Sequence, residues 1–219
     1  MIGVMPQPVA DRTLRQVWLF GSATSASASV TAPAGIQKGD LMVLIDAPED
    51  AVAINTASVP ADFTQFRDVP SSGWETKAVM SYKIADGTEG GATITGMTGA
   101  VENAKVLLVF RGKARITGMT MVSQQYDVSN GDPSGVVANF SGITPAASPV
   151  IALGTVQCRG ATPPPFQTQS PAFAASLTGG HLRVGYTIYD KAAALANQDV
   201  DLADNGQGNI VTVCGLVVS

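Results

Sequence analysis

Oxygen-bearing side chains gather near the C-terminus in the stretch QDVDLADNGQGN, residues 198–209. Asp199 and Asp201 would share one face of a strand, since side chains two residues apart point the same way, and Asp204 follows in a turn. Clustered carboxylates can bind Ca²⁺, but this spacing lacks the fixed ligand positions and the closing Glu of an EF-hand loop. The stretch is therefore either a weak calcium site or, as we favour, a solvated acidic turn.

The sequence holds a single histidine, His181, within GGHLRV at the expected start of a strand. A G-x-S-x-G nucleophile motif does not accompany it, and no second histidine could share a metal ion with it. The 17 acidic residues stand mainly in turn-like stretches such as APEDA and DGTE. We predict a structural or surface histidine, no catalytic residue, and no cofactor beyond the weak calcium alternative. An enzyme that uses His181 or an acidic pair is the last-ranked hypothesis.

Two aromatic residues lie in loop-like stretches where a ring could be presented to a partner. These are Trp74 in SSGWETK and Phe166 in ATPPPFQTQ. Such rings could form a sugar-binding platform or a partner contact. The alternative, which we favour, is that each ring covers an edge of the core.

The two cysteines, Cys158 and Cys214, each lie in an apolar strand-like run. Their spacing matches no zinc motif, which would need further ligands nearby. Two buried free thiols that pack as small apolar residues are the favoured reading. A disulfide that joins the two strands is the alternative.

Strand signals dominate the chain, as short runs rich in Val, Ile, Thr, Tyr and Phe that are bounded by Gly, Pro, Asn and Asp. Helical periodicity is nearly absent, and KAAALANQ is too short to form a helix alone. We predict strands at residues 15–22, 26–32, 40–47, 62–69, 76–85, 91–97, 105–112, 116–128, 134–142, 149–158, 181–190, 198–203 and 209–219. This pattern predicts an all-β fold, a jelly-roll-like antiparallel β-sandwich.

Three of the predicted strands differ in their apolar pattern. DLMVLIDA (40–47) and KVLLVFRG (105–112) are nearly continuous apolar runs, which predicts burial on both faces. TKAVMSYKIA (76–85) alternates instead, which predicts a strand with one solvated face carrying Val79, Ser81 and Lys83.

The stretch GIQKGD leads into the first of these apolar runs. Gly35 and Gly39 give the backbone the freedom that a tight turn needs. Asp40 can accept backbone N–H hydrogen bonds at the start of the strand. We interpret the stretch as a folding device and not as a catalytic one.

The two halves of the chain resemble each other in three stretches that occur in the same order. ASVTAPAGIQKGDLMVLIDA matches VVANFSGITPAASPVIALGT, MSYKIADGTE matches VGYTIYDKAA, and KVLLVFRG matches VTVCGLVVS. We therefore predict a sandwich at residues 15–219 built from two pseudo-repeats, about 26–112 and about 134–219. A short N-terminal arm, residues 1–14, would become ordered against a partner.

Composition excludes several partners. Charged residues make up only 14% of the chain and the net charge is −4, with no basic stripe to neutralise phosphates, so nucleic acid is not expected as a partner. A membrane span needs about 18 consecutive apolar residues, and no such run occurs. The first residues lack the pattern of a signal peptide, so we expect synthesis in a host cytoplasm. Low surface charge favours contact between chains.

The ordered set VTAPAGIQKGDLMVLIDA, SYKIADGTEGGATITG and KVLLVFRG resembles a group of virion proteins of tailed phages and prophages, with similar proteins in gene transfer agents. The resemblance covers residues 28–112 well and 134–219 loosely. It departs at VPADFTQF, where Asp62 stands in place of the Gly of the group's turn. Its motifs are structural, so the resemblance brings no site residues.

The resemblance implies a non-enzymatic virion component, either a capsid-decoration or minor head protein or part of a tail. Its partners would be major capsid or tail proteins and further copies of itself, with no membrane partner. The alternative is a receptor- or carbohydrate-binding module of a tail fibre, which would read glycans through Trp74 and Phe166 with or without Ca²⁺.

Overall fold

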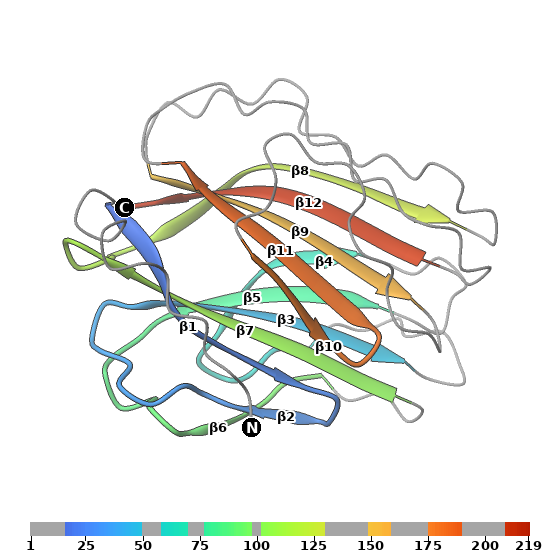
Figure 1. The fold of residues 1–219 in the computed structure, drawn as a ribbon, viewed down its shortest axis with the longest axis horizontal. Helices are drawn as coiled ribbons and strands as arrows, with labels where there is room; N and C mark the ends of the chain where they lie inside the picture. Colours follow the sequence, from blue (N-terminus) through green and yellow to red (C-terminus); the bar gives the residue numbers. More distant parts are fainter. Residues whose placement is uncertain are drawn as a thin grey trace.

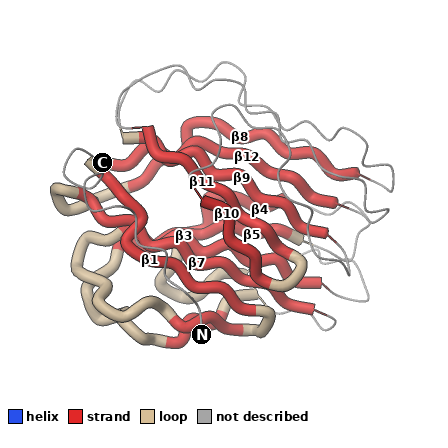
Figure 2. The backbone as a smooth tube through the Cα atoms, in the orientation of Figure 1, coloured by secondary structure: helices blue, strands red, loops and turns tan. Residues whose placement is uncertain are grey.

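A computed structural model of the protein describes residues 16–49, 58–69, 77–97, 102–129, 149–158, 175–189 and 209–219. Within these ranges the chain forms strands and no helix (Figures 1 and 2). The strands are β1 (Val17–Ser25), β2 (Ser29–Thr31), β3 (Leu41–Glu49), β4 (Thr64–Val69), β5 (Ala78–Ile84), β6 (Thr93–Thr95), β7 (Glu102–Gly112), β8 (Met119–Ser129), β9 (Val150–Cys158), β10 (Ala175–Gly179), β11 (Leu182–Tyr189) and β12 (Asn209–Val218). The described part thus contains no helix that could span a membrane.

Ten of these strands form two antiparallel sheets that lie face to face (Figure 1). The first sheet has the order β1-β7-β3-β5-β4 and the second has the order β10-β11-β9-β12-β8. The all-β sandwich prediction is therefore confirmed. A jelly roll is not specifically shown, because each sheet is formed by one half of the chain, whereas a jelly roll passes the chain back and forth between its sheets.

The two sheets have the same strand order along the chain. If β1, β3, β4, β5 and β7 are matched with β8, β9, β10, β11 and β12, the neighbours in one sheet are the neighbours in the other. The register agrees as well: Val43 lies opposite Tyr82 in the first sheet, and Leu153 lies opposite Tyr186 in the second. An internal repeat predicts this arrangement.

The repeat extends to an irregularity in the strand ladder. In the β1–β7 pair the register skips Phe20, since Leu19 lies opposite Phe110 and Gly21 opposite Val109. In the matching β8–β12 pair it skips Val122, since Met121 lies opposite Leu216 and Ser123 opposite Gly215. A β-bulge re-aims the side chain at the bulged position, so both halves carry this device at the same place.

The main core fills the space between the two sheets. Phe110 of β7 and Tyr186 of β11 meet edge to face in it, with ring centroids 5.6 Å apart. The rest is aliphatic from both sheets, and its members with no exposed surface are Leu41, Val43, Ile45, Ala47, Met80, Ala104, Val106, Leu108, Ile151, Leu153, Leu182, Val184, Cys214 and Leu216. Burial of this apolar surface is the dominant stabilising term for the sandwich.

A second, smaller core covers the outer face of the first sheet. The short pair β2–β6 contributes Val30 and Ile94, which pack with Met42 and Leu44 of β3 and Leu107 of β7. In Figure 1 this pair lies on the side of the first sheet away from the second sheet. The central strands β3 and β7 of the first sheet are therefore buried on both faces.

The burial of the outer face tests the predictions made from the apolar patterns of β3 and β5. Every residue of β3 is buried, which confirms the prediction made from its continuous apolar run. The prediction of a half-solvated β5 was wrong, because Val79 and Ser81, on the face expected to be solvated, have no exposed surface. That face belongs to the covered side of the first sheet.

One strand of the structure was not predicted, and some predicted elements are not tested. β10 was missed, because ASLTG has a single β-branched residue and no aromatic residue. Predicted strands at 134–142 and 198–203 and the predicted arm at 1–14 lie outside the described residues.

Candidate functional site

The predicted site residues lie outside the part of the chain that the structure describes. This holds for the calcium candidates Asp199, Asp201 and Asp204 and for the contact candidates Trp74 and Phe166. In the described part, polar side chains gather at the two ends of the sandwich.

The register excludes a disulfide between Cys158 and Cys214. Cys214 of β12 lies opposite Leu153 of β9, and Cys158 lies opposite Asn209. Five residues along a strand correspond to about 16 Å, whereas the Cα atoms of a disulfide lie at most about 7 Å apart. Cys214 is a buried free thiol, and burial raises its pKa to about 12 despite the positive charge of Arg67.

One end of the sandwich joins the first and third motifs of the phage-like resemblance. Asp40, which precedes β3, is 2% exposed. Arg111 of β7 grips its carboxylate with two hydrogen bonds, Nε to Oδ1 at 2.8 Å and Nη2 to Oδ2 at 2.7 Å. Asp40 also accepts the Gln37 N–H at 2.8 Å, and Arg111 donates to the Gly35 carbonyl at 2.8 Å. The turn, the start of β3 and the end of β7 are thereby fixed together.

Two further residues, Phe20 and Gly39, contribute to the structure around the Asp40–Arg111 ion pair. The guanidinium carbon of Arg111 lies 3.8 Å from the centre of the Phe20 ring, so the bulged residue of β1 covers the ion pair. Gly39 has φ +92°, and a Cβ there would collide with the side chain of Arg115, so only glycine fits this turn. The interpretation of GIQKGD as a folding device agrees with these contacts.

The second motif, YKIADGTE, forms a closed turn next to this end. Glu89 accepts the N–H groups of Asp86 at 3.0 Å and Gly87 at 2.9 Å, and it pairs with Lys83 at 3.0 Å. Burial raises the pKa of Glu89, but these hydrogen bonds outweigh burial and hold the pKa below its ordinary value. The charged groups of this turn are therefore used to fix its own backbone.

An open pocket of about 290 Å³ lies beside the turn. Its charged lining residues are Asp62, Lys83 and Glu89. Lys83 bonds to both carboxylates, at 3.5 Å and 3.0 Å. The lysine thus offsets one of the two negative charges, and the charged groups of the pocket are already bonded to one another.

A buried ion pair lies on the outer face of the first sheet. Lys105 of β7 lies directly opposite Asp46 of β3, and neither side chain has exposed surface. Lys105 donates to Asp46 at 2.5 Å and to the Met97 carbonyl at 2.6 Å. Burial raises the pKa of Asp46, although the lysine acts in the opposite direction. Gly96 packs on the carboxylate, where a Cβ would collide with it.

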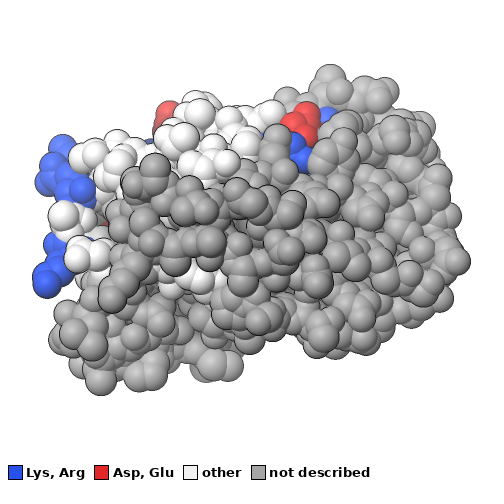
Figure 3. All heavy atoms as spheres, turned by 90° about the horizontal axis from the view of Figure 1, so that it is seen from above, with Lys and Arg blue, Asp and Glu red and all other residues white. Residues whose placement is uncertain are grey.

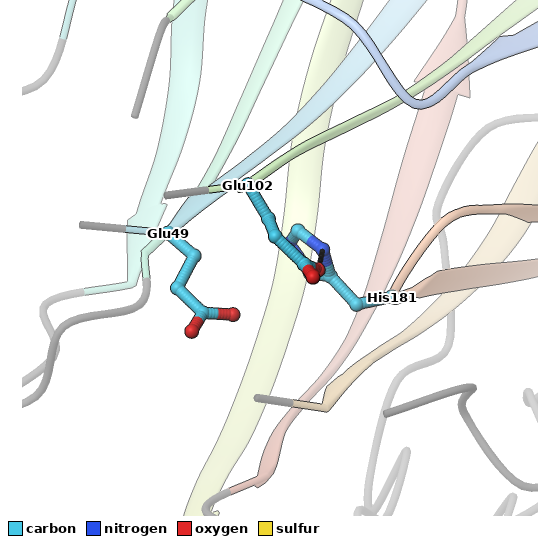
Figure 4. Close-up of side chains that lie close together, drawn as sticks. All are labelled: Glu49, Glu102 and His181. Carbon is cyan, nitrogen blue, oxygen red and sulfur yellow. Dashed lines mark hydrogen bonds and ion pairs between the residues drawn. The ribbon is translucent and has the colours of Figure 1, made fainter. Parts of the chain in front are cut away.

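The opposite end of the sandwich brings together Glu49, Glu102 and His181 (Figure 4). Glu49 is the last residue of β3 and Glu102 the first of β7, and the two lie directly opposite each other in the ladder. His181 comes from the other sheet, in the turn between β10 and β11. One potential ligand atom from each side chain lies within 4.8 Å of the other two.

Both ring nitrogens of His181 have partners, and the ring is buried. Nε2 lies 2.6 Å from the Ala47 carbonyl oxygen and Nδ1 lies 3.1 Å from Oε2 of Glu102. A carbonyl oxygen can only accept, so Nε2 carries a hydrogen. Nδ1 then either donates to the carboxylate as an imidazolium or, in the neutral ring, presents a lone pair toward it. In both cases His181 ties the second sheet to β3 and β7 of the first.

Chemically, this end offers one imidazole nitrogen and two carboxylates that converge from three strand ends. Such a set can hold a proton or a cation. The sequence predicted a structural histidine but missed the two glutamates, because nothing in their spacing shows that residues 49, 102 and 181 meet. The available signal was that 49 and 102 flank the two continuous apolar runs.

No protein-family model matches the sequence, and neither a curated protein nor a solved structure matches it. The geometry of the chain itself therefore carries the functional argument.

Proposed function

We propose that the protein is a non-enzymatic structural component of a virion, a capsid-decoration or minor head protein or part of a tail. The observation that carries the proposal is the interlock of Asp40, Arg111 and Gly35, together with the closed turn around Glu89. The motifs that resemble phage virion proteins thus use their polar groups to hold strands and turns together. This use suits a scaffold that presents surfaces to neighbours.

The surface supports the same proposal. Charged residues are scarce in the chain as a whole. In Figure 3 the described part of one face is mostly uncharged, with Lys and Arg at one end and a second, mixed group of acidic and basic side chains toward the other. A low-charge β-rich surface favours burial against other chains, and many weak contacts on a particle act together. Its partners would be major capsid or tail proteins and further copies of the chain.

The test is immunogold electron microscopy on particles purified from an induced lysate of the source strain. Label over the head would support a decoration role, and label along the tail would support a tail role. Particles from a strain that lacks the gene provide the control for antibody specificity. The proposal fails if the protein is abundant in the lysate while purified particles carry no label above that control.

Label confined to the tail tip would instead favour the receptor- or carbohydrate-binding module. Trp74→Ala and Phe166→Ala would then be tested on a glycan array. Loss of glycan binding in either variant would support that reading, and unchanged binding would exclude the two rings from it.

A further inference from the structure

We propose that Glu49, Glu102 and His181 bind one divalent transition-metal ion, with Zn²⁺ the best match, and that this ion joins the two sheets at their end. The proposal is independent of the role in a virion.

The first support is the state of the histidine. A metal-binding histidine usually donates its other ring N–H to a carbonyl or carboxylate, which fixes the tautomer and aims the free nitrogen at the metal. In His181 this partner is the Ala47 carbonyl, 2.6 Å from Nε2. Whenever the ring is neutral, Nδ1 carries no hydrogen and its lone pair faces Glu102 (Figure 4).

The second support is the spacing of the ligand atoms. Zinc binds imidazole nitrogen and carboxylate oxygen at about 2.0–2.2 Å, so two ligands of a tetrahedral ion lie roughly 3.4 Å apart. Nδ1 of His181 and Oε2 of Glu102 are 3.1 Å apart. The Glu49 carboxylate lies within 4.8 Å of both, so a shift of this side chain would complete the set of three ligands. Three protein ligands would leave a position for water or for a group from a partner.

The third support is electrostatic. Glu49 and Glu102 are directly opposite each other at the end of the β3–β7 ladder, where like charges are unfavourable. Glu49 is only 5% exposed, so water screens its charge poorly. A cation between the two carboxylates would be attracted by both of them.

The ligand set also indicates which ion fits. Imidazole favours Zn²⁺ and its neighbours in the first transition row, whereas Ca²⁺ and Mg²⁺ prefer oxygen ligands alone. The Glu102 side chain is 49% exposed, so an ion can enter from solvent.

The test uses the full chain after removal of metal with a chelator. Isothermal titration with ZnCl₂ is expected to show one ion per chain, and the melting temperature is expected to rise and level off at one equivalent. Glu102→Gln keeps the shape of an exposed side chain and removes its charge. It should weaken Zn²⁺ binding by more than the roughly 10–100-fold that loss of an outer partner costs.

His181→Gln should remove Zn²⁺ binding as well, and the visible d–d absorption spectrum of added Co²⁺ should differ from that of the unaltered protein, because a nitrogen ligand has been lost. Asp62→Asn is the matched control, since it removes an exposed carboxylate beside Lys83, near the opposite end of the sandwich. It should bind Zn²⁺ as the unaltered protein does.

The proposal is overturned if the unaltered chain binds no Zn²⁺, or if Glu102→Gln binds it as tightly as the unaltered chain. If His181→Gln does not fold, the Glu102→Gln result decides alone. Zn²⁺ binding by another acidic cluster would survive both substitutions and would likewise overturn the assignment.

Discussion

In the first sheet the β3–β7 pair begins with Asp40 gripped by Arg111, whereas the matching β9–β12 pair of the second sheet has Val150 opposite Val217. The strand order and the register are the same in both places. The same backbone arrangement therefore accommodates the Asp40–Arg111 ion pair in one sheet and two valines in the other.

A second matched position differs in the same way. Asp46 lies opposite Lys105 in the first sheet, and Val156 lies opposite Val211 in the second. Replacing a buried ion pair with apolar residues is often neutral or stabilising, because taking two charges out of water costs about as much as their attraction returns. The comparison teaches that the fold does not require its buried charges. We infer that they oppose wrong pairings, since a shifted β3 or β7 would bury each charge alone.

The largest expected effect comes from breaking the fully buried Asp46–Lys105 ion pair. Lys105→Val should lower the free energy of unfolding by about 3–5 kcal/mol, because it leaves Asp46 buried and unpaired. The double variant Asp46→Val/Lys105→Val copies the second sheet and should recover most of the loss. Urea unfolding of the unaltered protein, Lys105→Val and the double variant measures both effects. A double variant no more stable than Lys105→Val would contradict the comparison.

Substitutions in the Asp40–Arg111 ion pair should change the free energy of unfolding in the same way but by less. Asp40→Val should lower the free energy of unfolding by about 2–3 kcal/mol. This is less than for Lys105→Val, because the Arg111 side chain is 19% exposed and water can partly solvate it. Asp40→Val/Arg111→Val should be more stable than Asp40→Val alone. The double-mutant cycle gives the coupling energy between the two side chains, and additive effects would show that the ion pair contributes nothing.

The two bulges allow a matched pair of truncations. Phe20→Ala should cost about 2 kcal/mol, since it removes a ring that packs on Arg111 and on the second core. Val122→Ala, at the equivalent bulge, should cost less than about 0.5 kcal/mol, because Val122 is 42% exposed. Thermal unfolding of both variants tests the pair, and equal losses would show that the bulges have equal roles.

A pH experiment tests the turn around Glu89. The pKa of Glu89 is lowered in the folded protein, so its charge stabilises the fold above the ordinary value of 4.5 and that contribution is lost as the pH falls through the folded pKa. Glu89→Gln should cost about 1 kcal/mol at neutral pH. The difference from the unaltered protein should vanish on acidification. A difference that persists in acid would mean that the side chain acts through packing alone.

The smallest expected effect concerns the thiols. A reducing agent should leave the melting temperature unchanged, since the register rules out a Cys158–Cys214 bond. In a Cys158→Ser background, Cys214 should react with Ellman's reagent only after unfolding, because its pKa of about 12 leaves almost no thiolate at neutral pH. Rapid labelling of the folded variant would show that β12 opens readily.

The sequence was informative where a strand carries its own signal. The continuous runs of β3 and β7 predicted burial on both faces, and the order of the three matched stretches predicted two pseudo-repeats. The errors arose where a neighbour decides the outcome. The alternation of β5 could not reveal that its second face is covered, and β10, with one β-branched residue, carries only a weak strand signal. The Glu49, Glu102 and His181 cluster depends on how the sheets stack, which local pattern does not contain.

The stacking itself has a consequence for how this molecule can change. β10 and β11 of the second sheet lie against β1 and β7 of the first sheet. Since β10 and β11 match β4 and β5, the matched strands of the two sheets run in opposite order, as they would in a two-fold symmetric dimer. A homodimer must accept every substitution twice. Here the two halves belong to one chain, so a substitution can change one half alone. His181 and Lys77 occupy matched positions, five residues before Tyr186 and Tyr82. His181 belongs to the cluster with the two glutamates, whereas Lys77 pairs with Asp68 at 3.1 Å. A covalently joined pair can thus carry a feature at one end only, which gives the molecule a direction that a symmetric dimer lacks.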